Sequence, residues 1–263
     1  HPDRDLRLIV VPPPQMGTEL SAGTIDGFCS GGPWNQAAVL RGLGHVAITG
    51  YELWNNAPEK VLGVSQSWAQ ENPNTHLALI RALIEAACWL DDRTNLAEAA
   101  DILASDKYVG MGAGIIESSL LGKCRYGIGE PETDLPDYHV FHRHAANFPW
   151  VSHGVWILSQ MYRWGQLTAP VDLLAVARSV YRPDLYRAAA LPLGVSVPVT
   201  DMKQEGAHRS SWRTGDIEFG PDKFVDDRLF DPAHPVSYLE GFEIHSLRLP
   251  PDKITLSGSL TPA

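Results

Sequence analysis

The stretch "GTIDGFCSGGPWNQAAV", residues 23–39, decides the fold, because strand, turn and helix signals follow one another in it. Residues 25–29 are mostly apolar and suit a short buried strand, whereas the glycines that follow favour a tight turn. Pro33 is typical of a first helical residue, and the apolar pattern after it runs to a stop at Gly42. The stretch therefore predicts a strand, a glycine turn and a helix that begins at Pro33.

Two further strands flank this unit in the sequence. "LRLIVV" (6–11) and "HVAIT" (45–49) are rich in β-branched and apolar residues, and a short helix is predicted over "QMGTELSAG" (15–23). Strands that alternate with short helices predict a parallel sheet with right-handed crossovers. In such a sheet the turn after a strand presents free N–H groups, and a helix dipole adds attraction for an anion. The glycine turn is thus a candidate oxyanion cradle, and the alternative is a tight turn with no ligand.

Beyond residue 50 the pattern becomes mainly helical and then irregular. Helical periodicity predicts helices over 72–92, 95–105, 114–123 and 148–167, and two short helices over 171–189. From residue 195 turn residues dominate. We therefore divide the chain into an α/β segment with the anion-site turns (1–70), a helical part of the ligand-binding fold (71–194) and an irregular tail that packs back on the lobes (195–263).

Composition excludes several classes of protein. The chain has 263 residues, 44% of them hydrophobic, and 8 Trp, which is typical of a folded globular protein. With 21 Lys and Arg against 31 Asp and Glu, the net charge is −10 and no basic run occurs, so a nucleic acid is not an expected partner. No apolar run is long enough to span a membrane. A small anion remains compatible with this net charge, because nearby N–H groups and one buried cation act on it more strongly than the distant charges of the protein do.

No catalytic motif is present, and we expect neither an enzyme nor a bound cofactor or metal. The sequence lacks a nucleophile elbow, a phosphate-binding glycine loop and a zinc signature. The most enzyme-like cluster holds His139, His142, His144 and His153. A metal site would require these histidines to meet in space, and the alternative is that they are partly buried histidines beside aromatic residues.

Arg81 lies on the long predicted helix, one turn before Glu85. One interpretation is an ion pair between these two residues on a solvated face, which would stabilise the helix by roughly a few tenths of a kcal/mol. The other interpretation is a cation that points at the glycine turns. The sequence leaves both open.

Several motifs together resemble a known family. "HPDRDLRLIVVPPPQM", "DGFCSGGPWN", "LWNNAPEKVLGVSQSWAQENPNTH", "FPWVSHGVWILSQMYRWGQ" and "VYRPDLYRAA" look like the nitrate/bicarbonate-binding family of bacterial ABC importers, which includes related cytoplasmic nitrate sensors. The resemblance runs in order over residues 1–190 and again at 230–239. It implies an α/β, periplasmic-binding-protein-like two-lobed fold of type II, here truncated at its amino end to a parallel sheet fragment plus helices.

The resemblance also implies a ligand site, with one departure. The family's motif reads Gly-Glu-Pro-Trp where this chain has Gly31-Gly32-Pro33-Trp34, so one carboxylate is missing from the cradle. The positions that match the family's pocket are Gly32, Pro33, Trp34, Gly50, Arg81 and Gln15. We predict that these residues bind the ligand and that none of them is catalytic.

The function that the resemblance implies is recognition of a small oxyanion, with nitrate first and nitrite or bicarbonate next, for delivery to the permease components of an ABC importer. The expected location is the periplasm or the outer face of the membrane. One alternative is a cytoplasmic nitrate sensor that acts on an RNA-binding antiterminator protein. The other is a metal-dependent enzyme that uses the histidines of residues 139–153. The first lobe's opening segments have no counterpart in this chain, which we therefore expect to be a carboxy-terminal part of the family chain.

Overall fold

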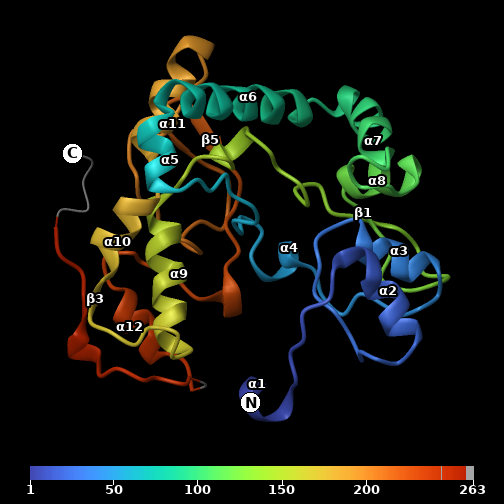
Figure 1. Ribbon diagram of the computed structural model, residues 1–263, viewed down its shortest axis with the longest axis horizontal. Coiled ribbons are helices and arrows are strands. Elements are labelled where there is room, and N and C mark those ends of the chain that lie inside the picture. Colours follow the sequence, from blue (N-terminus) through green and yellow to red (C-terminus); the bar gives the residue numbers. More distant parts are fainter. Residues whose placement is uncertain (244, 259–263) are drawn as a thin grey trace. The chain divides into compact units, whose positions relative to one another are not determined.

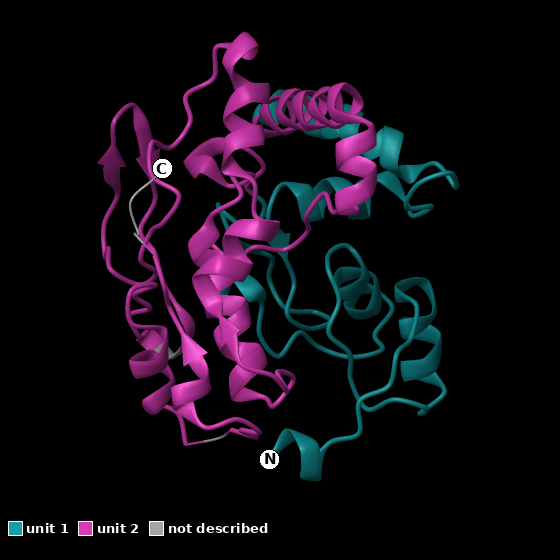
Figure 2. Ribbon diagram, turned by 60° about the vertical axis from the view of Figure 1, so that its left-hand side comes forward, with its two compact units in different colours: residues 1–52, 92–139 teal, residues 53–91, 140–263 magenta. Residues whose placement is uncertain are grey.

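A computed structural model describes residues 1–243 and 245–258 and divides them into two compact units. Unit 1 holds residues 1–52 and 92–139, and unit 2 holds residues 53–91 and 140–263 (Figure 2). The chain therefore passes from one unit to the other three times. These unit boundaries differ from the domain boundaries expected at residues 70 and 194. The expected boundaries come from changes in sequence pattern along the chain, and they stay a prediction.

Unit 1 is built from short helices, long connecting segments and one small hairpin. Its elements are α1 (Pro2–Asp5), α2 (Pro13–Ser21), α3 (Trp34–Leu40), α4 (Gly50–Leu53, whose last residue belongs to unit 2), the 3-10 helix η1 (Arg93–Asn95), α7 (Leu96–Ala104), α8 (Ala113–Leu120), β1 (Lys123–Cys124) and β2 (Thr133–Asp134). Helix α7 packs on α8, and α2 packs on α3.

Unit 2 contains the longer helices, which Figure 1 allows the reader to follow along the chain. Its elements are α5 (Gln66–Glu71), α6 (Pro73–Asp91), η2 (Arg143–Ala145), α9 (Val151–Arg163), β3 (Val171–Asp172), α10 (Leu173–Val180), α11 (Pro183–Ala190), η3 (Leu191–Leu193), β4 (Trp212–Thr214), β5 (Ile217–Phe219), η4 (Val225–Asp227), α12 (Pro235–Glu240), η5 (Pro251–Lys253) and β6 (Ile254–Thr255). Helices α10 and α12 both pack on α9, and α11 packs on α6.

The predicted helices are confirmed with small shifts in their bounds. Helices α2, α6, α7, α8 and α9 cover the segments where helical periodicity predicted them, and α10 and α11 are the two predicted short helices. Helix α3 begins at Trp34, and Pro33 is its N-cap instead of its first residue. After α3, Gly42 takes a left-handed conformation with φ of +67°, which agrees with the predicted stop. No helix in the described part of the chain is long and apolar enough to cross a membrane.

The predicted strands are wrong. Segments 6–11, 25–29 and 45–49 contain no strand in the structure. Each of the sheets that are present in the described residues has two strands: β1 with β2 and β4 with β5 are antiparallel, and β3 with β6 is parallel. Apolar and β-branched composition reports whether a segment suits a strand, but a strand forms only where a second segment supplies the matching hydrogen bonds.

The main core of unit 2 surrounds helix α9. Val155 of α9 and Leu174 of α10 have no exposed surface, and Phe224 and Phe230 from the irregular tail close the same cluster. A second cluster joins Ile84 of α6 to Tyr186 of α11 and includes Trp150 at the start of α9. Helix α9 is therefore held on several sides by segments that come from different parts of unit 2.

Candidate functional site

The glycine turn before α3 lies against α8. A Cβ atom built on Gly32 would collide with the Ser119 hydroxyl oxygen and would lie 3.6 Å from His139 Nε2. Ser119 Oγ and His139 Nε2 are themselves 3.5 Å apart. Glycine at position 32 thus permits a close approach that any side chain would prevent unless Ser119 moved.

Two further polar side chains complete the group around the turn. Asn35, in the first turn of α3, donates from Nδ2 to the Tyr138 hydroxyl over 3.3 Å. The ring of Tyr138 contacts that of His139 edge to face, with centroids 4.7 Å apart. The Asn35 side-chain oxygen is buried and has no hydrogen-bond partner among the described residues. We call Gly32, Asn35, Ser119, Tyr138 and His139 the turn cluster.

Helix α3 is fixed behind this cluster by a buried glutamine. Gln36 donates to the Arg125 carbonyl over 3.1 Å and accepts from the Arg125 N–H over 2.9 Å. Its amide also donates to the sulfur of Cys124 over 3.3 Å. Because one side chain satisfies both backbone groups of Arg125, α3 and the segment after β1 are held in one register. This arrangement orients the first turn of α3, where Trp34 and Asn35 lie.

A cavity of about 420 Å³ lies beside Gln36 within unit 1. Its polar lining comes from Gln36, Ser118, Arg125 and Glu132, and Arg125 and Glu132 are 3.9 Å apart at their closest charged atoms. The Arg125 guanidinium also donates to the Glu130 carbonyl over 3.2 Å. This guanidinium is therefore already engaged on two sides.

The turn before Gly50 is organised by Glu52. The Thr49 N–H and hydroxyl both donate to the Glu52 carboxylate, over 2.8 and 2.7 Å, and the Tyr126 hydroxyl donates to the same oxygen over 2.8 Å. Burial and this hydrogen bond to Glu52 raise the pKa of Tyr126 to about 12, so the phenol stays a donor. The Thr49 N–H is consumed by this contact, whereas Gly50 is exposed. Gly50, and not Thr49, thus carries the backbone donor available at this turn.

The six predicted ligand residues fall in both units. Gln15 is exposed on α2, Pro33 is buried and Trp34 is half-buried, and these lie in unit 1 with Gly32 and Gly50. Arg81 lies on α6 in unit 2. The joint role of the six in one site therefore stays a prediction. Ser119 and Asn35 are not among the predicted residues. The double glycine is the signal that could have indicated a neighbour such as Ser119, because a position that requires glycine implies a close contact.

The environment of Arg81 excludes its simpler interpretation. The described residues form no ion pair between Arg81 and Glu85, and Arg81 Nε is buried without a hydrogen-bond partner among them. A buried guanidinium nitrogen without an acceptor is costly, so this donor of Arg81 is unmatched among the described residues. Whether Arg81 faces the glycine turns stays a prediction, because those turns belong to unit 1 and Arg81 belongs to unit 2.

The histidines of residues 139–153 do not gather. His139 lies by Ser119 in unit 1, His142 lies 3.3 Å from the Asn147 side-chain oxygen, and His144 contacts the Glu218 carbonyl at 2.7 Å. His153 is buried and contacts Glu205 at 2.9 Å. Within residues 1–243 and 245–258 no group of three or more potential ligands is placed to hold a metal ion. The metal site that the alternative of a metal-dependent enzyme requires is therefore not seen at these histidines in the described part of the chain.

Glu205 is the centre of a buried charged network in unit 2. It is fully buried, and it accepts from His153, Lys203 and the Trp54 indole nitrogen, the last over 3.3 Å. Burial alone would raise the pKa of Glu205, but Lys203 and His153 outweigh it and the pKa is lowered. Burial lowers the pKa of His153, so its neutral ring donates from Nε2 to the carboxylate. This network is a structural one, because each of its charges is already matched.

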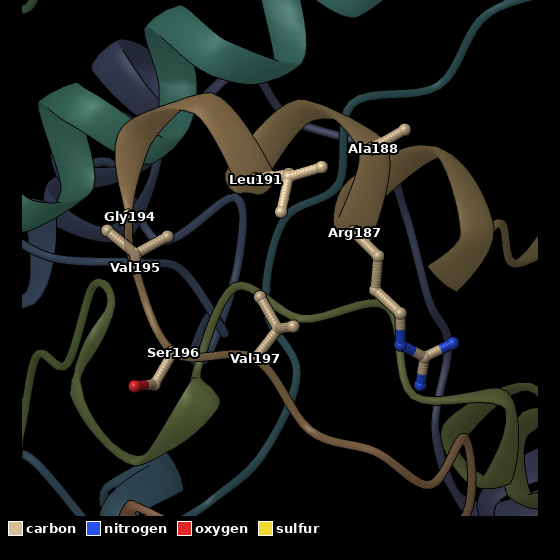
Figure 3. A pocket seen from close by; sticks show the side chains of 7 residues that line it. All are labelled: Arg187, Ala188, Leu191, Gly194, Val195, Ser196 and Val197. Atoms are coloured by element: carbon tan, nitrogen blue, oxygen red, sulfur yellow. The ribbon is translucent and has the colours of Figure 1, made fainter.

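A surface pocket of about 500 Å³ in unit 2 does not form a comparable site. It is lined by residues of α11, η3 and the segment after η3, with Arg187 beside Val197 (Figure 3). The Arg187 guanidinium is paired with Asp201 at 2.7 Å and donates to the Pro198 carbonyl over 3.0 and 2.9 Å. The cation of this pocket is therefore neutralised from within unit 2.

Comparison with known proteins shows what the chain is similar to. Residues 1–104 match the model of the NMT1-like family. The chain is 38% identical over 244 residues to the nitrate import ATP-binding protein NrtC of Synechocystis sp., covering 93% of this chain and 34% of that protein. It is 36% identical over 249 residues to the nitrate/nitrite binding protein NrtA of Synechococcus elongatus, covering 94% of this chain and 53% of that protein. The chain thus spans about half the length, or less, of these relatives.

A solved structure matches the fold. The periplasmic nitrate-binding protein NrtA from Synechocystis superposes with a TM-score of 0.82 at 31% identity, covering 93% of this chain and 60% of that chain. The chain therefore has the architecture of part of a periplasmic-binding-protein-like fold, as predicted. The predicted resemblance to the nitrate/bicarbonate-binding family is confirmed.

Proposed function

We propose that this chain is part of a solute-binding protein that recognises a small oxyanion, with nitrate as the ligand, for import by an ABC transporter. The observation that carries the proposal is the unpartnered, buried Nε of Arg81, in a chain related to proteins named for nitrate and nitrite binding. Nitrate is a planar anion with acceptor oxygens only, so its site must supply donors and positive charge. Arg81 supplies both.

The remaining contacts in the proposal come from unit 1. Backbone groups of Gly32, Trp34 and Gly50 act as donors, Pro33 shapes the turn, and Gln15 is a peripheral side-chain contact. Ser119 and His139 lie directly behind Gly32 and hold the turn close, so they act on the ligand through the position of the turn. By this proposal the chain performs no chemistry, and its partners are the ligand and the permease components of the importer.

The proposed location follows that of the solved relative, which is described as periplasmic. A sensor that binds the same anion would share the site, and no feature of the described residues favours it over the transport role. Nitrite and bicarbonate are the competing ligands, and they differ from nitrate in shape and proton content. Discrimination among them depends on the placement of a few donors.

The proposal is tested by isothermal titration of the chain with nitrate, nitrite and bicarbonate. Charge-assisted hydrogen bonds contribute roughly 1.5–3 kcal/mol, so Arg81→Ala is expected to weaken nitrate binding by about 10-fold to 100-fold. Arg93→Ala is the matched control, because Arg93 is exposed just after α6 and is not a predicted contact. Equal weakening by both variants, or none by Arg81→Ala, would contradict the role of Arg81.

A further inference from the structure

The hairpin of β1 and β2 in unit 1 carries two pairs of opposite charge, and only one of them is in close contact. Lys123 is the ladder partner of Asp134, and the charged atoms of these two side chains touch. Two positions further along the same register, Arg125 and Glu132 lie opposite each other just past the end of the ladder. Their closest charged atoms are 3.9 Å apart, which is beyond hydrogen-bond distance. We call Arg125 and Glu132 the open pair.

Both side chains of the open pair line the cavity of about 420 Å³ beside Gln36. Gln36 fixes the backbone of Arg125, and the Glu130 carbonyl accepts from Arg125 Nη1 over 3.2 Å. Arg125 Nη2 donates no hydrogen bond within the part of the chain that the structure describes. An exposed ion pair at this separation contributes little stability, so a ligand that enters between the two charges displaces little.

The rest of the cavity wall is largely apolar and leaves room. Leu40 of α3 and Ile115 of α8 supply its large apolar side chains, and Gly112 and Gly114 supply wall without any side chain. A Cβ atom built on either glycine meets no heavy atom within 4 Å, so this side of the cavity is open. The volume lies in the range of roughly 300–1,000 Å³ that is usual for small-molecule sites. One cavity thus combines a cation, an anion and an apolar wall.

We propose that this cavity binds a free α-amino acid with an aliphatic side chain. The carboxylate of the ligand accepts from Arg125, its ammonium group donates to Glu132, and its side chain lies on Leu40 and Ile115. Only a zwitterion matches both charges of the open pair, because a simple anion such as nitrate would lie against the Glu132 carboxylate. None of the six residues predicted to bind the oxyanion lines this cavity, so it is a second site, independent of the proposed nitrate site.

The test is isothermal titration of the 263-residue chain with L-alanine, L-valine and L-leucine. Two analogues of L-leucine serve as matched probes: 4-methylpentanoate lacks the ammonium group, and 3-methylbutylamine lacks the carboxylate. We expect L-leucine to bind 1:1 with a Kd below about 1 mM, and each analogue to bind at least about 10-fold more weakly, because it leaves one charge of the site unmatched. Absence of binding by all three amino acids, or equal binding by an analogue, would overturn the proposal.

Matched variants of the hairpin show whether the open pair is the site. Glu132→Gln should weaken L-leucine binding at least about 10-fold, because the ligand ammonium loses its anionic partner. Asp134→Asn is the control: Asp134 is an exposed carboxylate of the same hairpin that does not line the cavity, and its loss should leave the Kd unchanged. Equal weakening by both variants would contradict the assignment. Arg81→Ala should leave L-leucine binding intact, so failure of the nitrate site and failure of this one are told apart.

Discussion

Helix α9 and segment 6–11 are both rich in large apolar residues, but one is buried and the other is exposed. Val155 of α9 has no exposed surface, whereas Val10 is fully exposed. A helix makes its backbone hydrogen bonds within itself and needs only a face to bury, which α10 and α12 supply. A strand makes none within itself and depends on a partner. The contrast shows that apolar composition predicts which secondary structure a segment can adopt. Whether a strand forms depends on a second segment that supplies the matching hydrogen bonds.

The largest expected effect on stability concerns the buried charged network around Glu205, which includes His153 of α9. Glu205→Ala would remove the group that neutralises Lys203 and accepts from His153. Breaking a buried pair by removing one partner costs about 3–5 kcal/mol, because the other charge stays buried. Urea unfolding followed by Trp fluorescence measures the loss. Glu240→Ala, at an exposed position on α12, is the control and should stay within about 0.5 kcal/mol of the parent chain.

A matched pair of leucines compares the two regions directly. Leu174 of α10 has no exposed surface and packs in the α9 core, whereas Leu8 is 87% exposed. Leu174→Ala should cost about 2–5 kcal/mol through lost burial and a cavity, and Leu8→Ala should change the free energy of unfolding by less than about 0.5 kcal/mol. A similar cost at both positions would mean that segment 6–11 is buried in solution and would break the comparison.

A substitution in the glycine turn is expected to reduce stability by a smaller amount, and a second substitution should restore it. In Gly32→Ala the added methyl group meets the Ser119 hydroxyl, and the resulting shift is expected to cost about 1–3 kcal/mol. Ser119→Ala removes that oxygen, and the Ser119 Cβ lies 3.8 Å from the new methyl position, which is ordinary contact. The double variant should therefore recover most of the stability in thermal melts. Failure of the rescue would show that Ser119 is not the limiting neighbour.

Acid sensitivity is the mildest expected effect and resides in unit 2. The folded-state pKa of His153 is lowered from 6.5 by burial, so this group stabilises the fold above pH 6.5 and the contribution is lost as pH falls below that value. The pKa of Glu205 is lowered from 4.5, so its contribution persists to lower pH and is lost below 4.5. Melting temperature should fall between pH 7 and pH 5, and less so in His153→Gln. An unchanged pH dependence in that variant would exclude His153 as the sensing group.

The sequence allowed most helices to be predicted, because helical periodicity and capping act over a few residues. Helix α6 was predicted over 72–92 and spans Pro73–Asp91. The strands over 6–11, 25–29 and 45–49 were predicted from composition and are wrong, since strand formation depends on residues far away in the chain. The parallel pair of β3 with β6 joins residues about eighty positions apart, and no local pattern indicated it.

The candidate site could be predicted only in part for the same reason. The sequence pointed to Gly32 and to Arg81, and their roles stay predictions; the structure shows a close neighbour at Gly32 and a buried, unpartnered nitrogen at Arg81. Ser119 is far from Gly32 in the sequence, and no motif links the two. The Arg81–Glu85 ion pair, one of the two interpretations that the sequence left open, is not formed among the described residues, because helical spacing permits such a pair without requiring it.

The central claim is that this chain holds a helical region packed around α9 and an exposed segment, 6–11, that forms no strand despite its strand-like composition. Hydrogen exchange of the 263-residue chain alone, read by mass spectrometry, tests it most directly. We predict that the amides of α9 exchange roughly 1,000-fold more slowly than those of residues 6–11, which should exchange close to the rate of an unstructured peptide. Equal protection of the two segments would contradict the account.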